Sequence, residues 1–230
     1  MFCKTYFAEA FVLPAAEVRF IVAGRRDMIF VKIVAATQNK GKIKEIKEIF
    51  SPLGFEVVSQ KEAVGDVYVE ETGKTFEENA KIKAHAIYNL CGGAVIADDS
   101  GLCVESLGGA PGIYSARYAG EGASDEERIK KLLFEMKDKE NRKAKFVTSV
   151  VMVIEGREFA ATGETYGEIL EKPTGHGGFG YDPVFFSEDL GKSFGEAEDS
   201  EKNAVSHRGR ALRLLYEKIY NQIKIGNCKM

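Results

Sequence analysis

The first organised part of the chain alternates strand patterns with helix patterns. Residues 29–36 form an apolar run typical of a buried strand, and residues 42–50 carry isoleucines at helical spacing. A second strand is predicted at residues 55–59, and a helix that begins after Thr75 runs to about residue 90, where two glycines end it. Strands that alternate with helices of this length build α/β sheets. The sequence therefore predicts an α/β fold.

The middle of the chain is richer in strands. Residues 94–97 are predicted to form a short buried strand with Asp98-Asp99-Ser100-Gly101 at its carboxyl end, where open α/β sheets place ligands. After a Gly-rich loop, Ser124 and Glu127 form the capping box of another helix. Residues 145–169 then form a predicted hairpin. So much continuous strand is atypical of a doubly wound fold, and we expect an elongated mixed sheet flanked by helices.

Composition limits the classes of function. The chain has 230 residues with 44% hydrophobic content, which is enough for one domain or two small lobes with a buried core. The chain has 32 Lys and Arg against 35 Asp and Glu, which gives a net charge of -3. The protein therefore has no overall positive electrostatic field that would attract a nucleic-acid backbone. The scattered cysteines and histidines argue against structural zinc and favour a reducing compartment. No apolar stretch reaches the roughly 20 residues of a membrane helix, so we expect a cytoplasmic protein without a membrane or nucleic-acid partner.

The two ends of the chain carry none of the motifs described below. We expect residues 1–27 to be an N-terminal extension with Met28 as a candidate start, residues 28–222 to form the folded domain, and residues 223–230 to form a tail. The extension contains a short apolar run, but Pro14 and the nearby charges argue against a signal peptide.

The first motif that points to chemistry is Thr37-Gln38-Asn39-Lys40-Gly41-Lys42, between the first strand and the first helix. Backbone amides, a hydroxyl, a side-chain amide and ammonium groups converge there at a helix N-terminus, which is typical of phosphate binding. The alternative is a polar surface turn with solvated lysines. A Walker A loop is excluded, because the nearest match, at Gly191-Lys192-Ser193, lacks the upstream glycine.

A second glycine-rich segment, Gly175-His176-Gly177-Gly178-Phe179-Gly180, has the spacing of a dinucleotide-binding loop. That motif requires a helix after it, whereas Tyr181-Asp182-Pro183 and the apolar residues that follow predict a strand. A loop that presents one aromatic face to a planar ligand is the better interpretation, and a mobile hairpin loop is the alternative.

Two acidic pairs, Glu70-Glu71 and Asp98-Asp99, flank the helix at residues 76–90, and a chain reversal through that helix brings them to one cleft. Mg²⁺ takes oxygen ligands and is usually held by one or two carboxylates together with substrate phosphates. The alternatives are a solvated acidic turn for Glu70-Glu71 and a backbone-capping role for one of the two aspartates.

Hydrogen-bond donors gather before the last helix, in Ser206-His207-Arg208-Gly209-Arg210 with Lys202 just upstream. A lone histidine in such a place is more often structural. An arginine in the first turn of a helix opposes the helix dipole, so an inward-facing Arg208 requires an anionic or carbonyl-rich partner.

Taken in order, these motifs resemble the inosine triphosphate pyrophosphatase family over about residues 32–220. The resemblance is carried by Thr37-Gln38-Asn39-Lys40-Gly41-Lys42, Glu70-Glu71-Thr72-Gly73 with Thr75-Phe76-Glu77-Glu78-Asn79-Ala80, Ala97-Asp98-Asp99-Ser100-Gly101-Leu102, Gly108-Gly109-Ala110-Pro111-Gly112-Ile113-Tyr114-Ser115-Ala116-Arg117, Gly178-Phe179-Gly180-Tyr181-Asp182-Pro183 and Ser206-His207-Arg208-Gly209. Enzymes of this family hydrolyse the non-standard purine nucleotides ITP, dITP and XTP to the monophosphate and pyrophosphate.

The resemblance implies a Mg²⁺-dependent homodimeric hydrolase with two lobes and a nucleotide cleft between them. It implies that residues 37–42 hold the triphosphate and that Ser100 also binds substrate. It further implies that Glu70 and Asp99 bind the metal, that Asp99 is the general base, and that Phe179 stacks on the purine. Of Glu70 and Glu71, the resemblance to the family's motif favours Glu70 as the metal ligand. The residues expected at the base and sugar end are Gly180, Tyr181, Asp182, Lys202, His207 and Arg208.

Two other functions are compatible with the same cleft. A nucleotide-sensing module binds without hydrolysis, but a pure binder gains nothing from carboxylates placed beside phosphates. A related pyrophosphatase acts on pyrimidine or modified nucleotides, and a release assay across nucleoside triphosphates separates it from an enzyme for non-standard purines.

Overall fold

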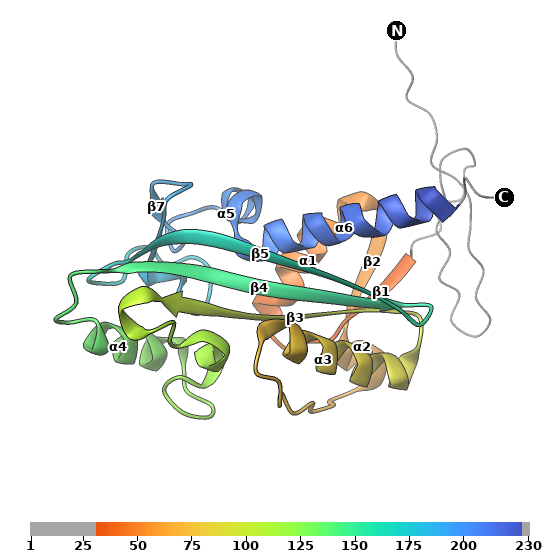
Figure 1. Ribbon diagram of the computed structural model, residues 1–230, viewed down its shortest axis with the longest axis horizontal. Coiled ribbons are helices and arrows are strands. Elements are labelled where there is room, and N and C mark those ends of the chain that lie inside the picture. The colour runs from red at the N-terminus through yellow and green to blue at the C-terminus, as the bar shows by residue number, and fades with distance from the viewer. Residues whose placement is uncertain (1–30, 227–230) are drawn as a thin grey trace, which may run out of the picture.

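The computed structural model describes residues 31–226, which form one long seven-stranded sheet with helices on both faces (Figure 1). The strands are β1 Val31–Ala35, β2 Phe55–Ser59, β3 Ala94–Val104, β4 Lys143–Ile154, β5 Arg157–Ile169, β6 Phe185–Ser187 and β7 Lys192–Ser193. The helices are α1 Lys40–Phe50, α2 Gln60–Val64, α3 Phe76–Cys91, α4 Asp125–Glu135, α5 Asp199–Val205 and α6 His207–Gly226. Short 3-10 turns include η3 Gly112–Arg117 and η4 Asp182–Val184. The expected extension at residues 1–27 lies outside the described residues.

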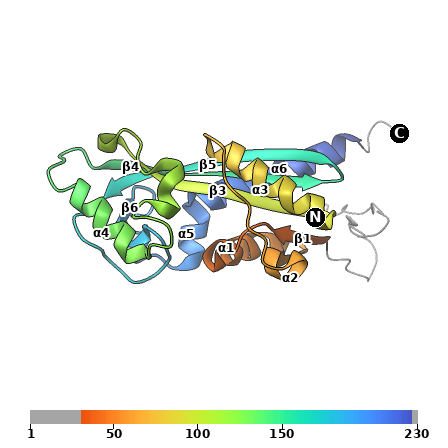
Figure 2. The same ribbon diagram turned by 90° about the horizontal axis from the view of Figure 1, so that it is seen from below.

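The sheet is mixed, with the strand order β2-β1-β3-β4-β5-β6-β7. β1 runs parallel to both β2 and β3, because α1 and α3 lie on the connections that return the chain to the same end of the sheet. The remaining neighbours, from β3 to β7, pair antiparallel. β3, β4 and β5 are long and give the molecule its elongated shape (Figures 1 and 2). The predicted mixed sheet flanked by helices is therefore confirmed.

Three buried clusters hold the helices on the sheet. α1 and α6 pack on one face, where Ile33, Ile96 and Leu212 belong to one cluster. α3 packs on the opposite face, where Ile87 and Val95 belong to a second. The third cluster lies at the other end of the sheet and joins α4 to β3, β4, β5 and β6. The elements that line the pocket described below are thus anchored in these clusters.

Local signals in the sequence set the ends of several elements. Ser124 and Glu127 form the predicted capping box at the start of α4. Thr75 caps α3 by accepting a hydrogen bond from a backbone amide of the first turn at 3.1 Å. The predicted hairpin of β4 and β5 turns at Glu155 and Gly156, whose φ angles of 53° and 71° both lie in the left-handed region that such tight turns require.

One predicted boundary is wrong and another falls inside a helix. β3 does not end at residue 97 but continues through Asp98 and Asp99 to Val104, because β4 pairs with it along its whole length. The acidic pair therefore lies in mid-strand rather than in a turn. α6 continues past residue 222 to Gly226, since no glycine or proline interrupts it earlier in that stretch, and part of the expected tail belongs to this helix.

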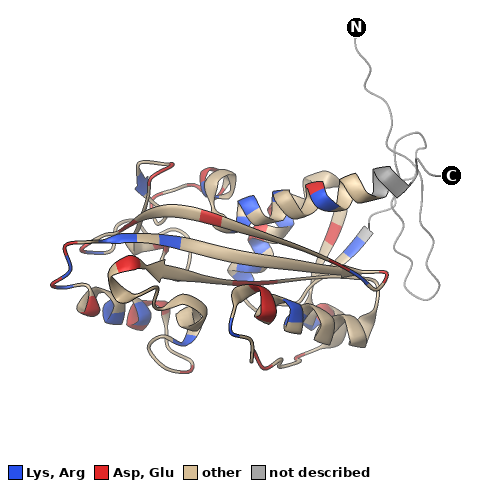
Figure 3. Cartoon of the chain, in the orientation of Figure 1, with Lys and Arg blue, Asp and Glu red and all other residues tan. Residues whose placement is uncertain are grey.

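Among residues 31–226, no helix is both long enough and apolar enough to cross a membrane. Figure 3 shows Lys and Arg interspersed with Asp and Glu over the helices and strand ends of the visible side. This distribution agrees with the small net charge of -3.

Candidate functional site

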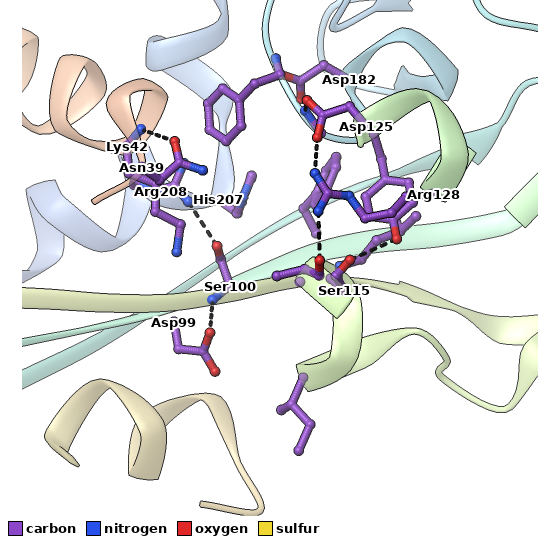
Figure 4. Close-up of a pocket in the computed structure, with 18 of the residues that line it drawn as sticks. Asn39, Lys42, Asp99, Ser100, Ser115, Asp125, Arg128, Asp182, His207 and Arg208 are labelled. Atoms are coloured by element: carbon purple, nitrogen blue, oxygen red, sulfur yellow. Dashed lines mark hydrogen bonds and ion pairs between the residues drawn. The ribbon is translucent and has the colours of Figure 1, made fainter. Parts of the chain in front are cut away.

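An open pocket lies where α1, β3 and the segment at residues 178–182 approach one another. α3, η3, α4, β4, α5 and the start of α6 supply most of the rest of its lining (Figure 4).

The two aspartates in β3 point to opposite faces of the sheet. Side chains alternate along a strand, and the two preceding residues already show the pattern. Ile96 lies in the cluster beneath α1 and α6, whereas Ala97 lies in the cluster beneath α3. Asp98 accordingly contacts α1 and α6, and Asp99 contacts α3. β1 pairs with β3 only as far as Ile96, so both aspartates lie just beyond the end of β1, beside the pocket.

Asp98 is a buried anchor for two cations. Its Oδ2 lies 3.0 Å from Lys42 Nζ and 3.0 Å from Arg208 Nη2. Burial by itself would raise the pKa of Asp98, but the charges of Lys42 and Arg208 outweigh it and hold that pKa well below its ordinary value. Burial also lowers the pKa of Lys42, against the attraction of Asp98. Asp98 therefore stays ionised and fixes Lys42 in the pocket wall.

The N-terminus of α1 forms one end of the pocket. Asn39 caps the helix, and its side-chain oxygen accepts from the amide of Lys42 at 3.1 Å. Thr37 Oγ1 accepts from the amide of Asn39 at 3.2 Å, which fixes the turn between β1 and α1. A helix N-terminus with a lysine beside it favours phosphate, because both its free amides and its dipole attract negative charge.

Asp99 is held on the α3 side of the pocket. Asn79 Nδ2 donates to its Oδ2 at 3.0 Å, and the amide of Ser100 donates to its Oδ1 at 2.9 Å. Lys83 places its Nζ 3.9 Å from the same Oδ1. Burial is the largest influence on Asp99 and raises its pKa above the ordinary value, despite the nearby charge of Lys83. A carboxylate with a raised pKa is a stronger proton acceptor than an ordinary aspartate.

Within the acidic pair before α3, Glu71 lines the pocket and Glu70 does not. Glu71 Oε1 accepts from Lys83 Nζ at 2.6 Å, which brings its carboxylate next to Asp99 across one shared ammonium group. Glu70 is exposed. Glu71, and not Glu70, thus lies beside Asp99 in the structure, because consecutive side chains of a non-helical segment point in different directions, and the metal ligand itself stays a prediction.

A row of alternating buried charges lies behind the pocket. Arg208, the second residue of α6, contacts Asp98 at 3.0 Å and also donates to Glu45 of α1. Lys202 lies between Glu45 and Asp182, at 2.8 Å and 2.6 Å. All five side chains are buried. The anionic partners that the sequence requires for an inward-facing Arg208 are therefore Asp98 and Glu45.

The segment at residues 178–182 places Phe179 against α1. A Cβ on Gly41 would come within 2.6 Å of the Phe179 ring, so glycine at this position allows the ring to lie there. Asp182 Oδ2 accepts from the amide of Phe179 at 2.7 Å, and the hydroxyl of Tyr181 donates to the carbonyl of Ser115 at 3.0 Å. The aromatic ring is thus carried by a loop whose backbone is held in place.

His207 is a buried part of the pocket wall. Its ring stacks on Phe146, with the centroids 4.6 Å apart and the planes 11° apart. Burial, together with the charges of Arg208 and Lys202, holds its pKa well below the ordinary value, so the imidazole is neutral at pH 7. Its Nδ1 is buried and has no hydrogen-bond partner among the described residues. His207 also lines the pocket, so its ring forms part of the surface that a ligand would meet.

Most of the site residues expected from the sequence line this one pocket. They are Asn39, Lys42, Asp99, Ser100, Phe179, Gly180, Tyr181, Asp182, Lys202, His207 and Arg208. Those outside the lining are Thr37, Gln38, Lys40, Gly41 and Glu70. Thr37 and Gly41 support the pocket through the contacts described above, whereas Lys40 lines a separate surface groove with Lys47 and Lys61.

The pocket also contains residues to which the sequence reasoning did not point, notably Lys83, Asp125 and Arg128. Lys83 follows Asn79 by four residues on α3, and this spacing places both side chains on one face of the helix. That spacing was a usable signal. Glu45 had none, because it is one of several charged residues on α1 and only its contacts with Arg208 and Lys202 distinguish it.

Two carboxylates of this pocket suit a divalent cation. Glu71 and Asp99 both approach the ammonium group of Lys83, at 2.6 Å and 3.9 Å, so a positive group already lies between their oxygens. Mg²⁺ is usually held by one or two carboxylates, waters and phosphates rather than by a cage of protein ligands. In keeping with this, the part of the chain that the structure describes contains no group of three or more His, Cys, Asp or Glu side chains that could hold a metal. The pair fits Mg²⁺ that arrives with a polyphosphate.

The arrangement offers different chemistry along the pocket. At one end, Lys42 and the start of α1 attract an anion. Next to it lie the carboxylates of Glu71 and Asp99, a type of group that can accept a proton or bind a metal ion. The aromatic ring of Phe179 and the neutral imidazole of His207 suit a flat, polar ring. Together these groups match the parts of a nucleoside polyphosphate.

Comparison with known proteins identifies the family. The sequence matches the Ham1 family over residues 33–218. It is 48% identical over 202 residues to the dITP/XTP pyrophosphatase of Clostridium perfringens, covering 84% of this chain and 99% of that protein. It is 47% identical over 191 residues to the dITP/XTP pyrophosphatase of Bacillus subtilis, covering 82% of this chain and 96% of that protein.

Solved structures agree with the sequence comparison. The Ham1 protein of Staphylococcus aureus matches with a TM-score of 0.74 at 42% identity, over 83% of this chain and 99% of that chain. The nucleoside-triphosphatase, or dITP/XTP pyrophosphatase, of Mycobacterium abscessus matches with a TM-score of 0.64 at 39% identity, over 80% of this chain and 97% of that chain. The protein described here belongs to the Ham1 family.

Proposed function

We propose that this protein is a nucleoside triphosphate pyrophosphatase that hydrolyses dITP, ITP and XTP to the nucleoside monophosphate and pyrophosphate. The names of the relatives support this substrate class. The single observation that carries the proposal is the convergence of Lys42, Asp99 and His207 on one pocket. A nucleotide-sensing module would not require a carboxylate of raised pKa next to the phosphate-binding helix.

Cleavage of the bond between the α- and β-phosphates requires a water molecule aimed at the α-phosphorus and a stabilised leaving group. Asp99 is suited to take the proton of this water, because its pKa is raised and Asn79 fixes its orientation. Lys42, anchored by Asp98, balances the negative charge of the phosphates. The water oxygen bonds to the α-phosphorus as the bridging oxygen leaves with pyrophosphate, and no covalent intermediate is needed.

Glu71 and Asp99 are the residues that would hold Mg²⁺. When bound, this ion supplies charge neutralisation at the phosphates and stabilises the pyrophosphate leaving group. Lys83 lies between the two carboxylates and reduces their mutual repulsion, which keeps both oxygens directed at the pocket. This assignment replaces Glu70 by Glu71.

For recognition of the base, we infer that the purine stacks on Phe179 and that its 6-keto oxygen accepts a hydrogen bond from His207. Arg208 is the weaker candidate for this contact, because its donors already bind Asp98, Glu45 and Ser100. A donor at the 6-position disfavours adenine, whose 6-amino group is itself a donor, by ~1–3 kcal/mol. Guanine shares the 6-keto group, so its exclusion requires a separate contact at C2.

We further infer that the enzyme is a homodimer and that the nucleotide lies between two lobes of each chain. The two-lobe arrangement is supported by the lining of the pocket, which comes from α1 and α3 at the parallel end of the sheet and from α4 and η3 at the other. The homodimer rests on the resemblance of the sequence motifs. The family match over residues 33–218 supports residues 28–222 as the pyrophosphatase domain.

The test is a product assay with dITP, ITP, XTP, dGTP, dATP and the pyrimidine nucleoside triphosphates, in which pyrophosphate and orthophosphate are measured separately. The first three substrates should give the highest kcat/KM, with pyrophosphate as the first product. Binding without turnover would favour a sensing module. Equal use of pyrimidine nucleotides or of dGTP would overturn the assignment to non-standard purines.

A further inference from the structure

We propose that Asp125, the first residue of α4, is a positioning residue that sets the place of Phe179 and thereby the affinity for the base of the nucleotide. The proposal rests on the proposed function, in which Phe179 is the surface for purine stacking. Asp125 belongs to none of the motifs that carry the family resemblance, yet its side chain lines the pocket.

Asp125 contacts the loop that carries Phe179. Its Oδ2 accepts from the amide of Gly180 at 2.7 Å, across 55 residues of sequence. The preceding amide, that of Phe179, donates to Asp182 Oδ2 at 2.7 Å. Gly178 and Gly180, on either side of Phe179, have φ angles of 72° and 64°, so the aromatic residue sits between two intrinsically flexible positions. The two carboxylates therefore restrict a backbone that its own sequence leaves free.

The carboxylate of Asp125 is itself held in place. Its Oδ1 accepts from Arg128 Nη2 one turn later on α4, and Arg128 Nη1 donates to the carbonyl of Ala116 in η3 at 2.6 Å. Tyr181 is tied to the same turn by its hydrogen bond to Ser115. Figure 4 shows Asp125, Arg128 and Ser115 together on one side of the pocket. The loop is thus attached to η3 directly through Tyr181 and indirectly through Asp125 and Arg128.

Loss of the Asp125 carboxylate leaves two anchors, at Asp182 and Tyr181, so the loop stays attached but its middle becomes free to move. The phosphate end of the pocket is built on α1, β3 and α3, which carry Lys42 and Asp99, and needs no contact from α4. Removal of Asp125 should therefore weaken binding of the base much more than it slows the chemistry at the phosphates.

The test compares Asp125→Ala with Glu126→Ala in the full chain, with dITP as substrate. Both changes remove one acidic residue from the first turn of α4, so they alter the helix dipole equally, but Glu126 is exposed. Asp125→Ala should raise KM roughly 5- to 20-fold with kcat within about twofold of wild type, because one hydrogen bond to a charged group is lost. Glu126→Ala should leave both constants unchanged. The inhibition constant of inorganic tripolyphosphate, which has no base, should be the same in all three proteins.

A second pair of variants separates the position of the oxygen from its charge. Asp125→Asn keeps an acceptor within reach of the Gly180 amide and should restore KM to within about threefold of wild type. Asp125→Glu keeps the charge but displaces the oxygens by one methylene, and should behave like Asp125→Ala. This pair also decides the matter if Asp125→Ala does not fold.

Three results would overturn the proposal: an unchanged KM in Asp125→Ala, a tripolyphosphate inhibition constant that rises in parallel with KM, or an Asp125→Asn variant no better than Asp125→Glu. Absence of dITP turnover by the wild-type protein would overturn the proposed function and this inference with it. Normal wild-type turnover with an unshifted KM in Asp125→Ala overturns this inference alone.

Discussion

Arg208 and Asp98 form an ion pair inside the protein, with 3.0 Å between Nη2 and Oδ2 and a relative exposure of 1% for each residue. Arg208 is the second residue of α6, and Asp98 lies in β3, 110 residues earlier in the sequence. Because Lys42 of α1 contacts the same oxygen of Asp98, one buried carboxylate joins three elements around the pocket. The same strand carries Asp99 on its other face, so the structural anchor and the proposed base are consecutive residues.

Arg208→Ala should destabilise the fold by about 3–5 kcal/mol, because it leaves Asp98 and Glu45 as buried carboxylates with one partner fewer. For a protein of this size the melting temperature should fall by roughly 6–20 °C. Thermal unfolding is the measurement, with Arg213→Ala, an exposed arginine of the same helix, as control. Equal melting temperatures for the two variants would show that the buried pair is not important for stability.

Asp99→Asn should lower kcat by about 10²–10⁴, because the amide keeps the shape of the side chain but cannot accept the proton of the attacking water. Equilibrium binding of dITP to the slow variant should remain close to that of wild type. Glu56→Gln, an exposed residue of β2, serves as the control. A near-normal kcat in Asp99→Asn would exclude Asp99 as the base.

The dependence of activity on Mg²⁺ should distinguish Glu71 from Glu70. Excess EDTA should abolish turnover, and Mg²⁺ should restore it. Glu71→Gln should raise the Mg²⁺ concentration for half-maximal activity by roughly tenfold or more, equivalent to about 1.4 kcal/mol of lost binding. Glu70→Gln is the matched control, because Glu70 is the adjacent residue and its own side chain lies outside the pocket lining. The reverse order of effects would restore Glu70 as the metal ligand.

Stability should depend on pH through His207. Its pKa in the folded protein is well below the ordinary value of about 6.5, so below pH 6.5 the unfolded chain binds a proton that the folded protein does not. The contribution of this residue is therefore constant above that pH, and stability falls as the pH decreases, by up to about 1.4 kcal/mol per pH unit. The free energy of unfolding, measured by denaturant titration between pH 5 and 7, should lose this slope in His207→Gln. His176→Gln, at an exposed position, should keep it.

The sequence by itself determined the features that depend on local interactions. The capping box of Ser124 and Glu127 and the turn at Glu155 and Gly156 are formed by residues close together in the chain, so their patterns could be read directly. The same holds for the alternation of strands and helices that predicts an α/β fold. The order of the motifs resembles a known family, and this resemblance allowed the prediction of eleven site residues that line one pocket.

Only the tertiary structure decided which partner each of these residues meets. β3 is long because β4 pairs with it as far as Val104. The apolar run at residues 94–97 does not by itself indicate that the strand continues beyond it. Glu71 rather than Glu70 enters the pocket through its contact with Lys83, and Glu45 reaches Arg208 from 163 residues away. The buried charges behind the pocket alternate in sign, because an ionised group taken out of water requires a partner of opposite charge. Such partners lie far apart in the sequence and become neighbours only when the sheet is assembled.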